Sequence, residues 1–477
     1  MKKLCDLIDS DLDIIIESIE EDSRIKGKNI LFFGIEGLTV DGHQYVKQAV
    51  ENGAVAVVAS KAVDVKVPVI RVKDTNMAMS LALSKFYDEA DKKMKLIGVT
   101  GTNGKTTTAT IVYQLINSID KCGYIGTNGI ECDDFKEKTT YTTPLPKELY
   151  CYLNKFYQSG CHYVSMETSS ERLLTKRLEA LSFEVAIFTN IGVDHLDKHK
   201  TMDNYIESKG RLFKLVKNQG YCIINNDDKY AKVMQKASNG RVITYGINNQ
   251  ADVMAKDIVV KKNKLTFTLQ YFGKEYQVKS PLSGMFNAYN LMAVIATCVS
   301  LGFNIEKVID AIKHLRPIES RLEFLDYGQP YEIVLDYAHT AGSLQGLLEY
   351  INIFAKGKII TVTGAAGGRD SSKRADMGEV VTRLSDHVIF TTDDPRFEDP
   401  HKIIDDLMAT IKSRSNYERE TNRALAIHKA LSMAEKGDVV VIAGKGRDNY
   451  MAVEDKYIPY CDVDSIEQFF EKKKEDF

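Results

Sequence analysis

The chain has 477 residues, of which 44% are apolar and 27% are charged, which is the composition of an ordinary folded protein with length for roughly three domains of about 150 residues each. Its 63 Lys and Arg residues nearly balance its 66 Asp and Glu residues, giving a net charge of −3. These values exclude a disordered or collagen-like chain, and also a global positive field that would hold nucleic acid or an anionic membrane. Any bound anion must be held by a local site.

The sequence contains no evident targeting segment. No apolar run approaches the roughly 18 residues that a membrane helix needs, and Met1 to Asp6 turn acidic before a signal-peptide core can form. We therefore expect a cytoplasmic protein without membrane or nucleic-acid partners. The eight cysteines form no C-x-x-C pair, so we expect them to be reduced and mostly buried.

The first 94 residues are predicted to form a small α/β domain. Ile30–Phe33 and Ala54–Val58 are continuous apolar runs typical of strands covered on both faces, and Tyr45–Asn52 between them is predicted to be a helix. A charged, lysine-rich stretch over residues 88–95 follows. We therefore place the first domain boundary after residue 94.

From residue 95 to residue 319, strand and helix patterns alternate, which indicates a mostly parallel, doubly wound sheet. Residues 242–279 break this rhythm with alternating runs such as Lys264–Leu269, which suit an antiparallel excursion, and a helix is expected from about Asn287 to Ser300. The predicted parallel strands are Lys95–Val99, Tyr163–Met166, Val185–Phe188 and Tyr221–Ile224.

After Pro317 the alternation restarts and predicts a third domain over residues 320–477, closed by a second parallel sheet. The fold class expected for the chain is therefore α/β with three domains. The predicted strands of the third domain are Tyr331–Leu335, Lys358–Val362, His387–Phe390 and Asp438–Ile442.

A glycine-rich segment, Gly98–Thr108, lies between a predicted strand and a predicted helix. In such a loop the backbone N–H groups close around phosphate oxygens, Lys105 reaches the terminal phosphates and Thr106 can bind Mg²⁺. The segment is not a strict Walker A sequence, because Val99 stands where that pattern has its first glycine. The residues expected to contact ATP here are Gly101, Thr102, Asn103, Gly104, Lys105, Thr106 and Thr107.

A phosphate loop alone leaves kinase, GTPase, motor and ligase functions open, but further motifs follow it in order. These are Met166–Ser170, Phe188–Asp197, Tyr205–Phe213, Gly284–Asn290, Arg321–Glu323 and Asp336–Thr340. Together with the loop they closely resemble the Mur ligases across all three predicted domains. Within that family the resemblance is greatest to the members that add the third peptide residue. That closer likeness depends on Asp22–Arg24, Thr142–Pro144 and Asp393–Arg396.

The resemblance implies an ATP-dependent ligase of peptidoglycan precursor synthesis that acts on small molecules as a monomer. The carboxylate of UDP-N-acetylmuramoyl-L-Ala-D-Glu would take the γ-phosphate of ATP, and the amine of a diamino acid would then displace phosphate. Metals and cations must converge on the phosphates for this transfer. The resemblance also implies an N-terminal UDP-binding domain, a central ATP-binding P-loop domain and a C-terminal Rossmann-like domain that binds the amino acid.

The resemblance assigns the metal ligands and the catalytic lysine. Thr106, Glu167 and His195 are expected to hold Mg²⁺. Lys209 matches the family's lysine that CO₂ converts to a carbamate, which would be a further metal ligand, and the reaction needs the neutral amine that a desolvated lysine supplies. The residues expected to be catalytic are Lys105, Glu167, His195 and Lys209.

Three nearby features bear on this assignment. His195 and His199 have the spacing of a zinc pair on a helix, but no third soft ligand is near in the sequence, so we favour magnesium. Glu171 stands where the family usually has His, which affects contacts around the metal site. Tyr141 stands where an Asn usually precedes the two threonines, so the hydrogen bond of that Asn is expected to be lost.

The same resemblance assigns the nucleotide and the acceptor substrate. Asn287 is expected to contact adenine, Asp336 the ribose and Arg321 the phosphates, with the last domain closing over the nucleotide. The residues expected to hold the UDP-sugar dipeptide are Ser23, Thr142, Thr143, Ser169 and Arg177.

The added amino acid is expected to bind in the third domain. Arg396 suits a bidentate grip on the second carboxylate of meso-diaminopimelate, and Arg369 suits a second contact. Asp394 replaces the usual Asn and adds a negative charge to the pocket, and Asp448 replaces the usual, longer Glu. Because these changes favour a more cationic amino acid, L-lysine stays open as the next choice after meso-diaminopimelate, with L-ornithine and lanthionine behind it. The residues expected to bind the amino acid are Arg369, Asp393, Asp394, Pro395, Arg396, Gly444 and Asp448.

Two other functions stay open at this point. A folylpolyglutamate-synthetase-like ligase shares the phosphate loop and the lysine, but Asp22–Arg24 and Asp41–Gly42 in a separate N-terminal domain suit a UDP moiety. A nucleotide-binding regulatory paralogue without ligase activity is disfavoured because the four expected catalytic residues are all present, namely Lys105, Glu167, His195 and Lys209.

Overall fold

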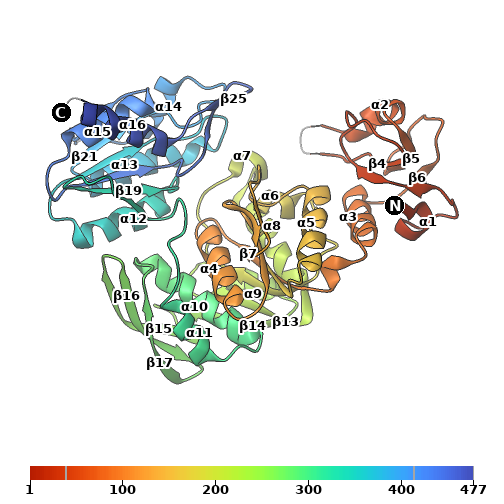
Figure 1. Ribbon diagram of the computed structural model, residues 1–477, viewed down its shortest axis with the longest axis horizontal. Coiled ribbons are helices and arrows are strands. Elements are labelled where there is room, and N and C mark those ends of the chain that lie inside the picture. Colours follow the sequence, from red (N-terminus) through yellow and green to blue (C-terminus); the bar gives the residue numbers. More distant parts are fainter. Residues whose placement is uncertain (38–39, 412–413, 476–477) are drawn as a thin grey trace.

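The computed structural model describes residues 1–37, 40–411 and 414–475, which form three large sheets, two small two-stranded sheets and their helices. The four-stranded sheet is drawn from residues 18–71, the eleven-stranded sheet from residues 95–280 and the six-stranded sheet from residues 323–443. Figure 1 shows the eleven-stranded sheet and its helices between the other two units. The α/β class with three domains is therefore confirmed, while the exact domain limits stay predictions.

The amino-terminal unit is a parallel sheet with strand order β3-β4-β5-β6. The two apolar runs predicted as strands are β4 (Ile30–Phe33) and β5 (Ala54–Ala59), and the helix predicted between them is α2 (Val46–Glu51). Nearly all residues of both strands are buried, which explains their continuous apolar pattern. The remaining elements are β1 (Lys2–Lys3), α1 (Leu4–Leu7), β2 (Ile15–Ile16), β3 (Ser18–Glu20), β6 (Val69–Arg71) and α3 (Thr75–Phe86).

The central sheet has a parallel middle and antiparallel edges. Its strand order is β10-β9-β8-β11-β7-β12-β13-β14-β15-β16-β17. The strands are β7 (Lys95–Thr100), β8 (Cys122–Gly126), β9 (Gly129–Cys132), β10 (Phe135–Glu137), β11 (Tyr163–Glu167), β12 (Phe183–Phe188), β13 (Val216–Asn225), β14 (Arg241–Gly246), β15 (Val253–Lys261), β16 (Lys264–Tyr271) and β17 (Lys274–Ser280).

The antiparallel excursion predicted for residues 242–279 is shorter than expected. Strand β14 runs parallel to both of its neighbours, so the excursion begins only at β15. The reason is that Ile243 and Tyr245 of β14 are buried in the same core as the parallel strands. A second antiparallel pair, β9 with β10, forms the other edge of the sheet and was not predicted.

Helices cover the central sheet and one of them completes the phosphate loop. The predicted turn runs from β7 into α4 (Lys105–Asn117), against which α10 (Met285–Ser300) packs. The other helices of this unit are α5 (Pro146–Gln158), α6 (Ser170–Leu174), α7 (Leu196–His199), α8 (Met202–Lys214), α9 (Ala231–Ala237) and α11 (Ile305–Ile312).

The carboxy-terminal sheet has strand order β18-β19-β23-β20-β21-β22. It is parallel as predicted except at one edge, where β18 is antiparallel to β19. The strands are β18 (Glu323–Leu325), β19 (Glu332–Asp336), β20 (Ile359–Thr363), β21 (His387–Phe390), β22 (Tyr417–Arg419) and β23 (Val439–Ala443), with a hairpin of β24 (Tyr450–Val453) and β25 (Lys456–Pro459). The helices are α12 (Ala341–Phe354), α13 (Arg374–Leu384), α14 (Pro400–Met408), α15 (Arg423–Met433) and α16 (Asp462–Glu475).

The structure also bears on the cysteines and on membrane-spanning helices. All eight cysteines are free and five of them are buried, as predicted. Among the helices of residues 1–37, 40–411 and 414–475, none is long and apolar enough to cross a membrane.

A buried ion pair fastens α16 to the carboxy-terminal unit. The Arg423 guanidinium donates through Nε and Nη2 to the two carboxylate oxygens of Asp462 at 2.7 and 2.8 Å, and both side chains are fully buried. Because the two charges lie away from water, each depends on the other for its stability.

Replacing Asp462 should destabilise this unit. We expect Asp462→Ala to lower the free energy of unfolding by about 3–5 kcal/mol, because it leaves the Arg423 charge buried without its partner. Urea unfolding followed by circular dichroism measures the change. Asp464→Ala, at an exposed position of the same helix, is the control and should cost less than about 0.5 kcal/mol. Equal losses in the two variants would contradict the role of the pair.

Candidate active site

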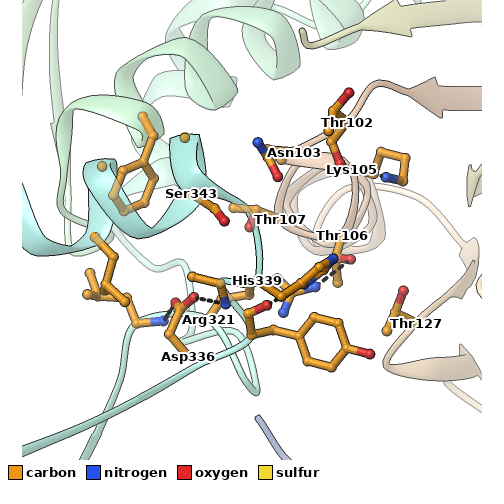
Figure 2. A pocket seen from close by; sticks show the side chains of 18 of the residues that line it. Thr102, Asn103, Lys105, Thr106, Thr107, Thr127, Arg321, Asp336, His339 and Ser343 are labelled. Carbon is orange, nitrogen blue, oxygen red and sulfur yellow. Dashed lines mark hydrogen bonds between the residues drawn. The ribbon is translucent and has the colours of Figure 1, made fainter. Parts of the chain in front are cut away.

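A cavity of about 1210 Å³ lies between the central and carboxy-terminal units. Figure 2 shows the phosphate loop on one side and residues around Arg321, Asp336 and Ser343 on the other. The cavity collects these groups because parallel strands end at one edge of each sheet. The predicted site residues that line it are Thr102, Asn103, Gly104, Lys105, Thr106, Thr107, Thr142, Glu167, His195, Asn287, Arg321, Asp336, Arg369, Asp393, Asp394, Arg396, Gly444 and Asp448.

The phosphate loop turns sharply between β7 and α4. Gly101 has φ +155°, and a Cβ there would lie 1.8 Å from the hydroxyl oxygen of Thr189, so no side chain fits. Lys105 Nζ donates to the carbonyl oxygens of Gly101 and Thr102 at 2.9 and 3.0 Å. Burial lowers the pKa of Lys105. The amine therefore lies at the cavity with only neutral backbone acceptors.

Oxygen atoms that suit a divalent cation meet at the end of β11. Thr106 donates its hydroxyl to Glu167 Oε2 at 2.9 Å, and Arg321 Nη2 donates to the same threonine oxygen at 3.0 Å. Glu167 is fully buried, and its Oε1 accepts from the Tyr124 hydroxyl at 3.1 Å and from the Thr127 backbone N–H at 2.7 Å. A hydroxyl and a carboxylate held in this way are ligands that Mg²⁺ prefers.

His195 precedes α7, and Lys209 belongs to α8. His195 adopts a left-handed conformation, with φ +58°, just before α7, and desolvation followed by the charges of Lys105 and Lys209 lowers its pKa. Lys209 of α8 is buried outside the cavity lining, and its Nζ donates to the Gly101 carbonyl at 2.7 Å and lies 4.4 Å from the centre of the Tyr205 ring. Burial, and then Lys105, lowers the pKa of Lys209 well below its ordinary value.

The second histidine with the spacing of a zinc pair, His199, contacts two serine hydroxyls. His199 is buried, with Nε2 3.0 Å from the Ser170 hydroxyl and Nδ1 3.4 Å from the Ser208 hydroxyl. It therefore packs between α6 and α8.

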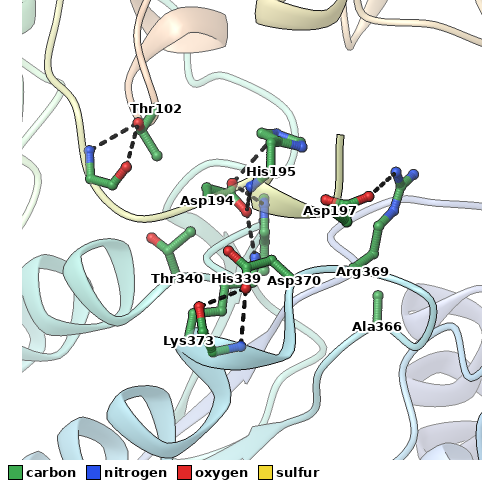
Figure 3. A network of polar contacts seen from close by, with 12 residues as sticks. Thr102, Asp194, His195, Asp197, His339, Thr340, Ala366, Arg369, Asp370 and Lys373 are labelled. Atoms are coloured by element: carbon green, nitrogen blue, oxygen red, sulfur yellow. Dashed lines mark hydrogen bonds and ion pairs between the residues drawn. The ribbon is translucent and has the colours of Figure 1, made fainter. Parts of the chain in front are cut away.

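A polar network joins the central unit to the carboxy-terminal unit (Figure 3). Lys373 Nζ lies 2.9 Å from Asp194 Oδ1, and His339 Nε2 lies 4.0 Å from Asp194 Oδ2. The Thr340 hydroxyl donates to Asn103 Oδ1 at 3.3 Å. The sequence motifs contain Asp194 and His339, but no role was predicted for either, and Lys373 was missed because its partner is remote in the sequence.

Asn287 and Asp336 line the cavity as expected but also bond to their own loops. Asn287 Nδ2 donates to the Ser283 carbonyl at 2.7 Å. The Asp336 carboxylate accepts from the backbone N–H groups of Leu322 and Ala338 at 2.6 and 2.7 Å. Burial raises the pKa of Asp336. Their contacts with adenine and ribose stay predictions.

The predicted amino-acid residues meet at the far end of the cavity. Asp394 accepts from Lys445 Nζ at 2.7 Å and from the Ala452 backbone N–H at 3.0 Å. The negative charge expected in the pocket from Asp394 is therefore balanced by buried Lys445, which was not predicted. Burial raises the pKa of Asp448 to about 6, and Arg369 lies 4.0 Å from Asp197. Within the described chain, the Arg396 guanidinium forms no ion pair, and Pro395 lies outside the cavity lining.

The residues predicted for the UDP-sugar dipeptide lead from the cavity toward the amino-terminal unit. Thr143 donates to the Glu167 carbonyl at 2.8 Å and accepts from the Ser169 backbone N–H at 2.9 Å. Arg177 pairs with Glu21 at 2.9 Å. Ser23 lies in the amino-terminal unit, where its hydroxyl donates to Gln48 at 2.6 Å. These residues thus follow a path instead of sharing one pocket.

Three family models match the chain in order. Residues 16–87 match the Mur ligase family catalytic domain, residues 99–298 the Mur ligase middle domain, and residues 320–446 the Mur ligase glutamate ligase domain. The chain belongs to the Mur ligase family. The family resemblance inferred from the motifs is therefore confirmed.

Curated relatives match the chain over nearly its full length. A UDP-N-acetylmuramoyl-L-alanyl-D-glutamate--2,6-diaminopimelate ligase 1 of Clostridium acetobutylicum is 39% identical, covering 98% of this chain and 97% of the relative. A Bacillus cereus ligase of the same name, without the numeral, is also 39% identical, over 92% of this chain and 90% of the relative.

Solved structures of Mur ligases have the same fold. A UDP-N-acetylmuramoyl-L-alanyl-D-glutamate--2,6-diaminopimelate ligase superposes with a TM-score of 0.69 at 29% identity, covering 98% of this chain and 97% of that chain. The MurF ligase of Thermotoga maritima in complex with ADP gives a TM-score of 0.65 at 20% identity, covering 98% and 99%. A folylpolyglutamate synthase of Mycobacterium tuberculosis, complexed with ADP and AMPPCP, gives 0.65 at 14% identity and covers 77% of this chain and 92% of that chain.

Proposed function

We propose that this Mur ligase uses ATP to join meso-2,6-diaminopimelate to UDP-N-acetylmuramoyl-L-Ala-D-Glu. The observation that carries the proposal is that the phosphate loop, Glu167 and the free Arg396 guanidinium line one cavity. The curated relatives with this activity in their names support the choice of substrates.

The phosphate loop would hold ATP, with Lys105 at the terminal phosphates and Arg321 reaching them from the carboxy-terminal unit. Thr106, Glu167 and His195 would hold Mg²⁺, and the hydroxyl and carboxylate oxygens of Thr106 and Glu167 are the donors that this ion prefers. When bound, Mg²⁺ supplies charge neutralisation at the phosphates. The short contacts among Thr106, Glu167 and Arg321 support this arrangement.

The substrate carboxylate would attack the γ-phosphorus of ATP, releasing ADP and forming an acyl phosphate. Contacts of Lys373 with Asp194 and of Thr340 with Asn103 hold the carboxy-terminal unit against the loop and limit the entry of water. The neutral amine of the diamino acid would then attack the acyl carbon, and phosphate would leave. Two arginines and one acid are proposed to orient that amine.

Arg396 and Arg369 would bind the distal carboxylate of meso-diaminopimelate, and Gly444 and Asp448 its ammonium group. Lys445 pairs with Asp394 at 2.7 Å and lies 3.7 Å from Asp393, which leaves the Arg396 guanidinium available for a second carboxylate. L-Lysine lacks that carboxylate and is therefore the second choice. The folate-type alternative shares only the fold, at 14% identity.

Phosphate release by the purified protein tests the proposal. We expect release from ATP and Mg²⁺ only when UDP-N-acetylmuramoyl-L-Ala-D-Glu and meso-diaminopimelate are both present. Arg396→Leu should raise KM for meso-diaminopimelate about 10- to 100-fold, the effect of losing a charged hydrogen bond. Turnover with L-lysine, L-ornithine or lanthionine instead would reassign the amino acid. No turnover with any of them would overturn the ligase proposal.

Lys209 is proposed to react with CO₂ through its neutral amine and to lose a proton, giving a carbamate. The buried position and lowered pKa of this lysine support the reaction. Carbon-13 NMR of the protein in ¹³C-bicarbonate should show a carbamate carbonyl signal that Lys209→Met lacks and Lys214→Met, on the same helix, retains. Lys209→Met should also lower kcat by about a hundredfold or more, as when one group that stabilises a transition state is lost. An unchanged carbon-13 spectrum in Lys209→Met would contradict the carbamate.

Asp448 should make amino-acid binding depend on pH. Its pKa is raised to about 6 by burial, so its attraction for the substrate ammonium is present above that pH and lost as the pH falls through it. We expect the kcat/KM ratio of wild type to Asp448→Asn to be large near about pH 8 and to approach one below about pH 6. Taking this ratio removes the titration of the substrate amine. A ratio independent of pH would contradict the role of Asp448.

A further inference from the structure

A buried arginine lies beside the residues proposed for the dipeptide substrate and has no assigned role. Arg172 of α6 donates through Nε to the Thr143 carbonyl at 3.2 Å, and its side chain is only 8% exposed. The nearest carboxylate is that of Glu171, 3.7 Å from Nη1, and the Glu171 side chain is 46% exposed. Among the described residues, none accepts a hydrogen bond from Nη1 or Nη2 of Arg172.

The ring of Tyr141 covers this guanidinium. The Arg172 guanidinium carbon lies 4.9 Å from the centre of the Tyr141 ring, a distance at which the cation and the ring attract each other. Tyr141 and Glu171 are two of the positions at which the chain departs from the usual family residues. Both departures therefore adjoin Arg172, which indicates that the three residues form one local arrangement.

The charges around Arg172 favour an anion. The neighbouring arginine, Arg177, is already paired through both terminal nitrogens with the Glu21 carboxylate at 2.9 Å. Burial, and then the charge of Arg177, lowers the pKa of Arg172. The carboxylate nearest to Arg172, that of Glu171, is half exposed and not within hydrogen-bond distance, and a buried cation that is weakly paired is costly. A ligand that supplies negative oxygen atoms would therefore be favoured at this point.

The position of Arg172 indicates which anionic ligand would bind there. Its Nε holds the carbonyl of Thr143, whose hydroxyl contacts the backbone of both Glu167 and Ser169. Arg172 therefore lies along the path from Glu167, a proposed metal ligand, toward the amino-terminal unit. The molecule that would follow this path is the nucleotide-sugar dipeptide, which carries carboxylates and a diphosphate.

We propose that Arg172, supported by the ring of Tyr141, binds an anionic oxygen group of the nucleotide-sugar dipeptide as a second arginine beside Arg177. The inference rests on the proposed function for the identity of that substrate. A guanidinium whose terminal nitrogens donate no hydrogen bond among the described residues suits a bidentate grip on a carboxylate or a phosphate.

Kinetics of Arg172 variants test the proposal. Arg172→Gln should raise KM for UDP-N-acetylmuramoyl-L-Ala-D-Glu about 10- to 100-fold, the effect of losing a charged hydrogen bond, and leave KM for ATP within about twofold. Arg172→Lys, which retains the cation, should show a smaller rise, and circular dichroism checks that both variants fold. Arg241→Gln, at an exposed position of β14, is the control for loss of charge and should behave as wild type.

Binding of shorter ligands distinguishes the two sources of the anion. Calorimetry would compare the whole dipeptide substrate with UDP-N-acetylglucosamine, which carries the diphosphate but no carboxylate. Weaker binding of both ligands to Arg172→Gln assigns the contact to the diphosphate. Weaker binding of the dipeptide substrate alone assigns it to a carboxylate.

Variants of Tyr141 test the supporting ring. Tyr141→Phe should keep the wild-type KM, whereas Tyr141→Ala should raise it, and the double variant with Arg172→Gln should be no worse than Arg172→Gln alone because both changes remove one interaction. Unchanged KM for the dipeptide substrate in Arg172→Gln, or equal rises for that substrate and for ATP, would overturn the inference. Failure of the proposed function would appear differently, as absence of turnover in the wild type.

Discussion

Two lysine amines converge on one backbone oxygen at the centre of this protein. Lys105 and Lys209 donate to the carbonyl of Gly101 at 2.9 and 2.7 Å, and neither has a carboxylate in contact within the described residues. Burial lowers the pKa of both amines, and the charge of Lys105 lowers the pKa of Lys209 further. One amine can then be neutral and reactive while the other stays available for phosphate.

The rest of the site is arranged around this unbalanced charge. Glu167 stands across the loop, held by hydrogen bonds from Tyr124 and Thr127 so that its oxygens keep one orientation. Lys373 reaches Asp194 from the carboxy-terminal unit. This ion pair links the central unit to the carboxy-terminal unit, which carries the residues proposed for the amino acid. In the proposed reaction, one shared cavity would hold the activated carboxylate and the attacking amine close to each other.

Departures from the usual family residues are compensated locally. Asp394 adds a carboxylate to the amino-acid pocket, and buried Lys445 balances it. Tyr141 replaces an amide with a ring, and the guanidinium of Arg172 lies against that ring. Lys445 thus offsets the added charge of Asp394, and Arg172 packs against the added ring of Tyr141.

The amino-acid sequence by itself determined the three-domain α/β class, the strands of the parallel sheets and the phosphate loop. These features depend on local patterns, such as the buried run Ile30–Phe33 and the glycines before Lys105, whose physical causes act within a few residues. The family motifs also identified most of the residues that line the cavity.

Only the tertiary structure decided which charges meet. Lys373 and Asp194 are 179 residues apart, and Lys445 and Asp394 are 51 apart. It likewise decided that β14 belongs to the parallel part of the sheet and that Arg172 lies beside Tyr141. Such contacts depend on how whole sheets and helices pack, because a side chain's charge partner is set by burial and distance in space, and no local pattern of residues encodes that distance.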